Sequence, residues 1–506
     1  MALKLPENFI PVFEKSYTHA RNKNPLLAAS ALLCLAELFC LKSLILPKLN
    51  NVTKSILKAF KISPVVAGAE VGSDLEEEDE AKNSGKGSGA SMGAYLLVVS
   101  GMTALSKFVE NLGTFVGSSF LQKSLVAILS IQSAFFGEGE KADNRKKVFE
   151  QKLKGLTKTV ATKIPLRNSL ASIKKTFSKL IHNPQALVVV VRLLKDSLVS
   201  TEKSDFNAIL PSLFDTYLND LLPYRDQVNS EEQTESTPVE PKDVEMVEDS
   251  VVESLVTGIV LKLAEGTFRP FYHRVFEWAT DSLHRQITFY RFSVHAAERL
   301  KSLFVTFAGY VITKAGESLS ENVELTRAIL QFFYHIFSND REGFVTTERF
   351  NLLVKPIVDL VSVRLVPNSY NGENIVRGSC ESVFFALFQI ESDWVISGEI
   401  SIKDLNSTII QLAVATNDLN RWQHLVELLA GKSQHKDSRV RLFTISSLEA
   451  IANELEKDFL PLLPPAVPFL ADLLGDDDEK VEAETKKMLV KLEAIVGEPL
   501  QPYFST

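Results

Sequence analysis

The sequence predicts an all-α fold, a HEAT/armadillo-type α-solenoid of stacked antiparallel helix pairs with acidic disordered loops. Three observations predict it: apolar residues recur at helical spacing, a segment near the C-terminus repeats at a fixed period, and no long stretch alternates as strands require.

The helical spacing is clearest between residues 296 and 311. The apolar positions there are separated by intervals of 4, 3, 1, 3 and 4 residues and are expected to form one stripe: Ala296, Leu300, Leu303, Phe304, Phe307 and Val311. The valine-rich run Leu187 to Val191 resembles a strand. It follows Asn183-Pro184, a pair typical of a helix start, so a buried helix is expected there.

The repeat lies in the last 70 residues. The pattern of Asp437, Val440, Arg441 and Leu448 returns 41 residues later in Asp478, Val481, Glu482 and Leu489. This period is in the range of HEAT and armadillo units. Because an isolated helix pair cannot bury both of its apolar faces, stacked neighbours must bury them for each other, which predicts a solenoid.

Proline steps are expected to mark where second helices of such pairs begin, since proline is tolerated in the first turn of a helix. The steps are Leu46-Pro47, Leu210-Pro211, Lys355-Pro356 and Leu463-Pro464.

Two acidic stretches predict linkers that divide the chain. One joins Asp74–Glu80 to the small residues Asn83–Gly93, and the other holds eight acids against the single base Lys242 between Ser230 and Ser250. The expected organisation is N-terminal helical repeats over 1–70, an acidic Gly/Ser linker over 71–93, helical repeats with a basic helix over 94–229, an acidic disordered loop over 230–250, and a C-terminal HEAT-repeat domain over 251–506.

Composition excludes several classes of function. A net charge of −8 and a pI of about 5.7 argue against a chain that coats nucleic acid by bulk charge, so any basic surface must be local. Cys34, Cys40 and Cys380 form an odd set without CxxC spacing, which argues against a disulfide framework or a zinc cage. A reducing compartment, the cytosol or the nucleus, is expected.

Membrane insertion and export are not expected. Met1–Ala20 lacks the layout of a secretory signal. The one candidate span, Leu26–Leu46, carries Glu37 and Lys42 and runs into Pro47, so a buried core helix is expected instead.

No catalytic, cofactor or metal site is expected. The eight histidines form no HExxH motif and no Cys/His cluster with metal-ligand spacing. Gly85-Lys86-Gly87-Ser88-Gly89 lacks the order of a phosphate-binding loop and is interpreted as linker. The acids Asp476–Glu479 are interpreted as the charged start of the last helix. We therefore expect no enzyme and no small-molecule substrate.

An aromatic cluster between Phe268 and Ala279 is the first candidate for a functional surface. Phe271, Val275 and Trp278 fall on one helical face, and Phe268 extends that face sideways. Two interpretations remain open. The cluster either packs in the core between repeats, or it forms a partner-binding groove of Phe268, Phe271 and Trp278 rimmed by Arg269 and Arg274.

A basic segment is the second candidate. Lys141 to Leu180 holds twelve Lys or Arg against only Asp143 and Glu150. At 3.6 residues per turn one apolar stripe is expected to face inward, formed by Phe149, Leu153, Leu156 and Val160.

A second stripe about 150° away holds Lys147, Lys154 and Lys158, with Lys146 and Lys152 on either side of the apolar stripe. These lysines form either an ordinary solvated face or a ridge that contacts RNA phosphates.

Four motifs resemble one known family. They are Thr267-Phe268-Arg269-Pro270 through Phe276-Glu277-Trp278-Ala279, then Leu303–Gly309, then Leu462-Leu463-Pro464 with Val467–Leu474, and finally Gly497–Phe504. In this order, near the chain end, they resemble the C-terminal part of the HEAT-repeat-containing protein 1 family, also called U3 small nucleolar RNA-associated protein 10. The resemblance is strongest over about 255–504 and looser back to about 94.

The resemblance implies a nucleolar, and hence nuclear, scaffold of the small-subunit processome. Family members act in small-subunit pre-rRNA processing and support transcription of ribosomal DNA by RNA polymerase I. It implies processome proteins, the U3 small nucleolar ribonucleoprotein and pre-rRNA as partners. Relatives are several times longer, so we expect a fragment, a truncated gene model or a shortened form. The alternative is a cytosolic HEAT-repeat adaptor, such as a transport or phosphatase scaffold.

Overall fold

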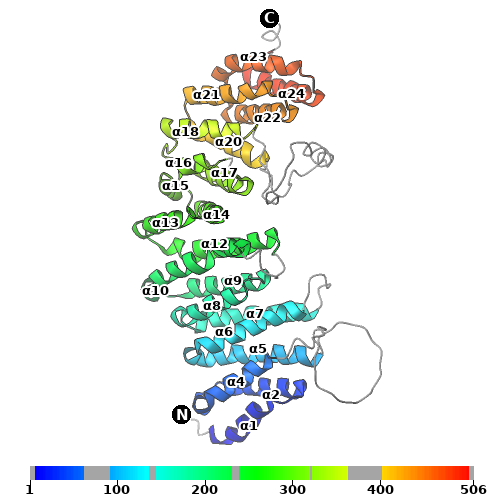
Figure 1. Ribbon diagram of the computed structural model, residues 1–506, viewed down its shortest axis with the longest axis vertical. Helices are drawn as coiled ribbons and strands as arrows, with labels where there is room; N and C mark the ends of the chain where they lie inside the picture. The colour runs from blue at the N-terminus through cyan, green and yellow to red at the C-terminus, as the bar shows by residue number, and fades with distance from the viewer. Residues whose placement is uncertain are drawn as a thin grey trace, which may run out of the picture. The chain divides into compact units, whose positions relative to one another are not determined.

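The computed structural model describes residues 6–61, 92–135, 144–230, 239–319, 322–362, 402–497 and 499–500. In these ranges the chain forms helices joined by turns, and no strand occurs among them. The all-α prediction is confirmed, and Figure 1 shows helix pairs stacked one on another within each part of the chain.

Two compact units make up the chain, Met1–Leu263 and Ala264–Thr506. The boundary expected at residue 250 falls within helix α12 (Pro241–Gly258), which packs along α9 (Pro184–Ser200) of the first unit. Gly258 shows how close the two helices are, because a Cβ atom there would lie 2.7 Å from Leu198 Cδ1.

Unit 1 is built from two rows of helices. In the first row each helix packs on the next: α2 (Pro25–Leu38), α5 (Met92–Leu112), α7 (Asn144–Lys163), α9 and α12. The second row holds α1 (Pro6–His19), α4 (Leu49–Ala59), α6 (Ser118–Phe135), α8 (Leu166–Lys179), α10 (Lys203–Thr216) with the π-helical turn η4 (Tyr217–Leu221), and α11 (Tyr224–Ser230). Short turns α3 (Lys42–Ile45), η1 (Leu46–Lys48), η3 (Gly113–Phe115) and η5 (Val260–Lys262) link them.

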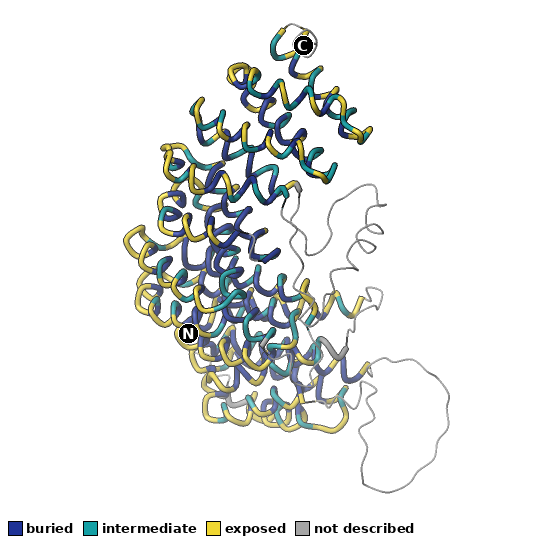
Figure 2. Tube along the Cα trace, turned by 45° about the horizontal axis from the view of Figure 1, so that its top comes forward, coloured by how far each residue is buried: buried dark blue, intermediate teal, exposed yellow. Residues whose placement is uncertain are grey.

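Unit 2 repeats the arrangement. Its first row runs through α14 (Leu283–Leu300), α17 (Val323–Ser338), α20 (Ile402–Thr416), α22 (Ser438–Leu455) and α24 (Glu479–Val496). The second row holds α13 (Glu265–Ala279), α15 (Ser302–Ala308), α16 (Ile312–Glu317), α18 (Thr347–Asp359), α21 (Leu419–Ala430) and α23 (Leu463–Leu474), with turns η7 (Gly431–Gln434) and η8 (Glu456–Leu462). Figure 2 shows the buried residues gathered between the rows, with exposed residues on the outer sides.

The 41-residue repeat corresponds to two successive helices of one row. Asp437 and Asp478 cap α22 and α24, since their Oδ1 atoms accept the backbone N–H of Arg439 and Lys480 at 3.0 and 2.9 Å. The guanidinium of Arg441 reaches across to both carboxylate oxygens of Asp476 at 2.6 Å. The hydrogen bond from Arg441 holds the pKa of Asp476 below its usual value.

The stripe expected from Ala296 to Val311 is divided. Helix α14 ends at Leu300. Lys301 has a positive φ of 52°, which interrupts the helical backbone, so α15 is a separate helix and the apolar positions do not form one stripe. Phe304, Phe307 and Val311 are buried, whereas Leu303 is 70% exposed. The valine-rich run at Leu187–Val191 does lie inside α9, as expected.

The proline prediction is half right. Pro47 lies in η1 just before α4, and Pro464 opens α23. Pro211 and Pro356, however, lie inside α10 and α18. A proline cannot donate to the carbonyl four residues earlier, and those residues, Asn207 and Leu352, are exposed, so water can satisfy both carbonyls.

The acidic loop expected over 230–250 is shorter, because α12 already begins at Pro241. Proline suits the first turn of a helix, and Asp243 in that turn complements the helix dipole. Val244, Val247 and Val251 then form a buried stripe at helical spacing. The expected linker at 71–93 lies almost entirely outside the described residues.

The expected core helix at Leu26–Leu46 is interrupted, since α2 ends at Leu38 and a short α3 follows. By length and apolar composition one helical stretch among the described residues, Met92–Phe115, is long enough to cross a membrane. Two-thirds (67%) of its apolar window is buried against neighbouring helices, as in a core helix.

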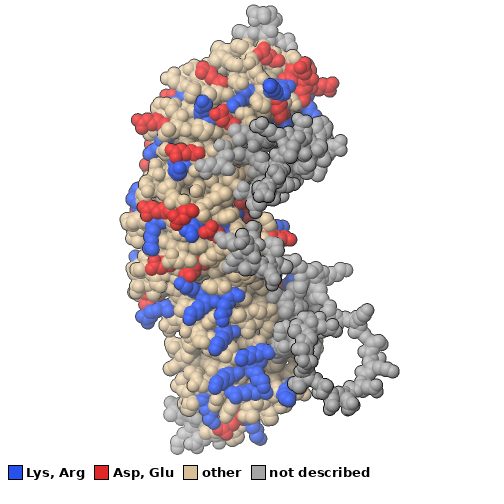
Figure 3. Space-filling view, in the orientation of Figure 1, with Lys and Arg blue, Asp and Glu red and all other residues tan. Residues whose placement is uncertain are grey.

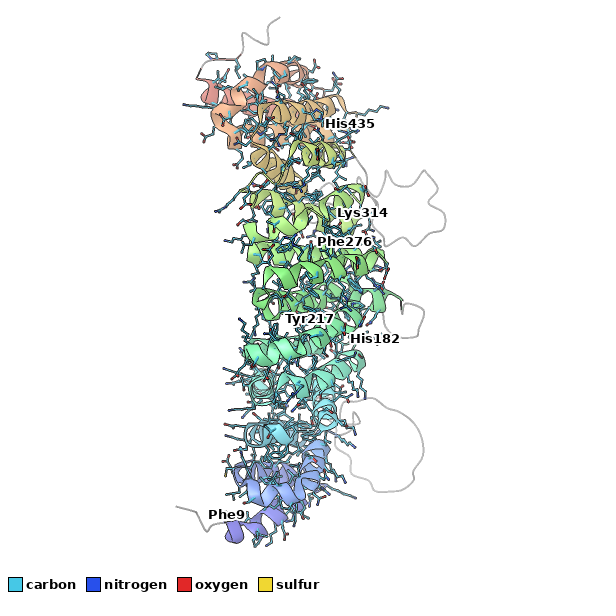
Figure 4. The ribbon with its side chains drawn as sticks, turned by 90° about the vertical axis from the view of Figure 1, so that its left-hand side faces the viewer. Phe9, His182, Tyr217, Phe276, Lys314 and His435 are labelled. Carbon is cyan, nitrogen blue, oxygen red and sulfur yellow. The ribbon has the colours of Figure 1, made fainter. Side chains whose placement is uncertain are left out.

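A buried ion pair joins α11 to α12 in unit 1. Arg225 Nη2 lies 2.8 Å from Glu248 Oε2, and the two side chains are only 5% and 2% exposed. Nearby, the hydroxyls of Tyr217 and Ser254 are 2.7 Å apart and equally buried (Tyr217 is labelled in Figure 4). These polar contacts fix the position of α12 on the preceding helices.

Glu248→Ala is expected to lower the free energy of unfolding by about 3–5 kcal/mol, because the change removes the buried carboxylate that pairs with the guanidinium of Arg225. The matched control is Lys195→Ala, which removes the partly exposed pair of Lys195 with Glu253 and is expected to cost about 1 kcal/mol or less. Urea denaturation followed by circular dichroism measures both variants. Equal losses in the two variants would contradict the structural role of the buried pair.

Candidate functional site

The aromatic cluster lies on α13 and supplies the core of unit 2. Phe268 and Phe271 are 2% and 3% exposed. The Phe268 ring meets Phe307 edge-on at 4.8 Å between centroids, and Tyr272 meets Phe304 at 5.4 Å. Phe268 and Phe271 are therefore core residues, and the groove interpretation is wrong for these two side chains.

The three other predicted residues of that groove reach solvent. Arg269 and Arg274 are exposed and Trp278 is half-buried. Arg269 forms an ion pair with Glu265 at 2.9 Å, and its guanidinium lies 5.0 Å from the ring centre of Phe307. The guanidinium of Arg285 lies 5.3 Å from the ring centre of Trp278. The two arginines and Trp278 are what remains of the predicted partner-binding surface.

One further aromatic residue, not expected from the sequence, lies at this surface. Tyr310 is 50% exposed, and its ring packs on His273 and Phe276 at 3.9 and 5.2 Å (Figure 4 labels Phe276). It follows α15, more than thirty residues after α13, so no local spacing in the sequence could connect it with the cluster.

The basic helix has the geometry that the sequence predicted. Phe149, Leu153, Leu156 and Val160 of α7 are 4% exposed or less and form its inner stripe. The outward lysines Lys147, Lys152, Lys154 and Lys158 are exposed, and Lys146 is half-buried. No residue in the described ranges forms an ion pair with any of these five lysines.

Neighbouring helices hold α7 firmly in place. The Tyr95 hydroxyl of α5 donates to the Arg145 carbonyl at 3.0 Å, and the Ser106 hydroxyl of α5 donates to Thr159 at 3.2 Å. Gly113 is essential at the far end, because a Cβ atom there would lie 2.5 Å from the Lys163 carbonyl oxygen. The inner stripe is thus fixed, and the lysines can only point outward.

Three other lysines of unit 1 are already paired with acids. Lys107 bonds to Glu110 at 3.2 Å, Lys174 to Asp220 at 2.7 Å and Lys195 to Glu253 at 2.6 Å. Figure 3 shows Lys and Arg side chains gathered on the visible face of unit 1, with few acids among them. The lysines of α7 therefore present positive charge that forms no ion pair with acids in the described ranges.

Two titratable side chains elsewhere have pKa values shifted by burial. Burial raises the pKa of Tyr224 to about 12, with a further contribution from Asp243. Burial also lowers the pKa of His335, which lies 3.5 Å from Glu298. Within the described ranges no three His, Cys, Asp or Glu side chains come together as metal ligands. Cys34 and Cys40 are exposed free thiols, and Cys380 lies outside the described residues.

Comparison with known proteins gives a consistent result along the chain. Residues 205–345 match the family described as the BP28CT (NUC211) domain. HEAT repeat-containing protein 1 of Homo sapiens is 28% identical over 99% of this chain and 21% of its own length. The Drosophila melanogaster homolog of that protein is 30% identical over 79% of this chain and 18% of its own length.

A fungal relative is named U3 small nucleolar RNA-associated protein 10. The protein from Meyerozyma guilliermondii is 27% identical over 49% of this chain and 13% of its own length. The chain thus spans about a fifth of the length of the human and Drosophila proteins.

Among solved structures, the karyopherin Kap121p bound to RanGTP is similar with a TM-score of 0.39 at 13% identity, covering 95% of this chain and 46% of that one. Importin beta is similar with a TM-score of 0.36 at 12% identity, covering 99% and 54%. The sequence matches and the stacked helix pairs together show that the chain belongs to the family of HEAT repeat-containing protein 1 and U3 small nucleolar RNA-associated protein 10.

Proposed function

We propose that this chain acts as a non-enzymatic scaffold of the nucleolar small-subunit processome, the pre-ribosomal particle that contains the U3 small nucleolar ribonucleoprotein. The observation that carries the proposal is the match to HEAT repeat-containing protein 1 over 99% of the chain, together with relatives named for association with U3 small nucleolar RNA. Stacked helix pairs suit this role, because they offer long outer surfaces on which partners dock.

In this proposal the chain acts in the nucleolus. It contributes to processing of small-subunit pre-rRNA and supports transcription of ribosomal DNA by RNA polymerase I. Its partners are processome proteins and the U3 ribonucleoprotein with its pre-rRNA. The exposed surface around Arg269, Arg274 and Trp278 is proposed as a contact for a protein partner, since it combines cations with a half-buried indole ring.

Gradient sedimentation tests the assignment to the processome. The tagged chain is expected to sediment with large particles that contain U3 RNA, and its purification should recover processome proteins. Sedimentation only in light cytosolic fractions would contradict the proposal and favour the alternative, a cytosolic transport or phosphatase adaptor.

We assign direct RNA contact to α7. Lys147, Lys154 and Lys158 point outward together, with Lys146 and Lys152 on either side. A lysine ammonium is a compact charge without the fork that reads base edges, so contact with phosphates should tolerate any sequence and weaken with salt. The absence of ion pairs on these five lysines, among residues that the structure describes, supports the assignment.

Changing Lys147, Lys154 and Lys158 together to Glu is expected to weaken binding to every RNA alike. For about three to five phosphates neutralised on single strands, log K should fall against log salt with a slope of roughly −2 to −4 in the parent chain. The triple variant should flatten this slope while the melting temperature stays nearly unchanged. Fluorescence anisotropy at several salt concentrations measures the slope. An unaltered slope in the triple variant would show that these lysines form an ordinary solvated face and do not contact RNA.

A further inference from the structure

The α7 and α9 helices lie side by side with their C-terminal ends level. The Ser200 hydroxyl at the end of α9 donates to the Ala161 carbonyl of α7 at 2.9 Å. Lys154 precedes Ala161 by seven residues and Arg192 precedes Ser200 by eight. At 1.5 Å per residue the two cations stand within about 2 Å of the same level along neighbouring helices.

The outward lysines lie on the α9 side of α7. Counting about 100° per residue, Lys147, Lys154 and Lys158 stand roughly 20–60° around the helix from Ala161, which faces α9. Lys152 lies on the opposite side, near Thr159, whose hydroxyl bonds to Ser106 of α5. A molecule that contacts the three lysines together therefore extends over α9 and away from α5.

Arg192 stands in the middle of the exposed face of α9. Around the axis of α9, Arg192 lies about 80° from Ser200, which faces α7. Lys195, which pairs with Glu253 of α12, lies beyond Arg192 in the same direction around the helix. Arg192 is exposed, and no ion pair holds it within the described part of the chain. On the other side of α7, the nearby cation of α5 is Lys107, which is already paired with Glu110.

We propose that an RNA strand runs along the α7–α9 strip, defined as Lys147, Lys154, Lys158 and Arg192, and that Lys154 and Arg192 bind the same or adjacent phosphates. This inference rests on the RNA contact proposed for α7 and specifies its path. From Lys147 to Lys158 the strip extends about 16 Å, which spans several consecutive nucleotides. The planar fork of Arg192 adds a bidentate phosphate contact that the lysines lack.

The residues between these cations favour RNA over an acidic protein. On this side of α7 the exposed positions among the lysines include Gln151, Gly155 and Thr162, which are polar or small. The exposed apolar residues nearby are single valines, Val148 on α7 and Val199 on α9, and neither is the aromatic anchor that a protein interface is typically built on. Two exposed acids, Glu150 and Asp196, face the same strip. Both carboxylates repel the phosphates of an RNA strand, so neutralising one of them should strengthen RNA binding.

Anisotropy titrations of the full chain with a labelled twelve-nucleotide oligouridine test the path. Arg192→Glu is expected to weaken binding about tenfold and to reduce the salt slope by about 0.7 for each phosphate lost. The matched control is Arg167→Glu, the same exchange at an exposed position of α8 in the second row, and it should leave affinity within about twofold.

Two further variants make the result independent of folding. Asp196→Asn should tighten binding and steepen the slope, which a damaged chain would not do. The double variant Lys154→Glu with Arg192→Glu should weaken RNA binding by less than the product of the two single fold-changes. The reason is that both side chains bind the same or adjacent phosphates.

Each outcome has a separate meaning. If the triple lysine variant of α7 loses binding while Arg192→Glu matches Arg167→Glu, the path over α9 is wrong and the contact by α7 stands. If the triple variant binds as the parent does, the α7 contact itself is wrong. A polyglutamate peptide of equal charge that competes with equal affinity would contradict the choice of RNA.

Discussion

The structure depends on one constraint: an amphipathic helix of this chain can bury its apolar side only against the helices next to it. Within each unit the helices of a row pack on their successors and on the opposite row, and the core lies between the rows. Contacts such as Arg441 with Asp476, or Ser200 with Ala161, join one repeat to the next. Stability of such a stack is a sum of neighbouring interfaces, so no central core limits how the outer surface varies.

This constraint separates the two sides of every helix by role. On α7 the inner stripe is fixed by Phe149 and Val160, and the outer side is free to carry charge at little cost to packing. The same separation makes charge changes on α7 informative, because Lys154 can be replaced without touching the core. It also explains how a chain with a net charge of −8 presents a local basic surface.

The sequence predicted what depends on local periodicity and missed what depends on distant neighbours. The orientation of α7 and the acidic start of α24 at Asp478 follow from patterns within single helices, and both agree with the structure. The burial of Phe268 and the exposure of Tyr310 depend on how α13 meets the segment after it, which no local pattern records. The helix start predicted at Pro211 was wrong for the same reason. The energetic cost of a proline inside a helix depends on whether the unpaired carbonyl, here that of Asn207, reaches water.

In the proposed function, the packed helices hold one charged surface of unit 1 against RNA inside a pre-ribosomal particle. Ultraviolet cross-linking of particles purified through this chain, followed by mass spectrometry of the RNA-linked peptides, tests it most directly. We expect linked peptides from residues 144–163 and 184–200, and none from α8. Linked peptides confined to α8 or to unit 2, with α7 and α9 unmodified, would contradict it.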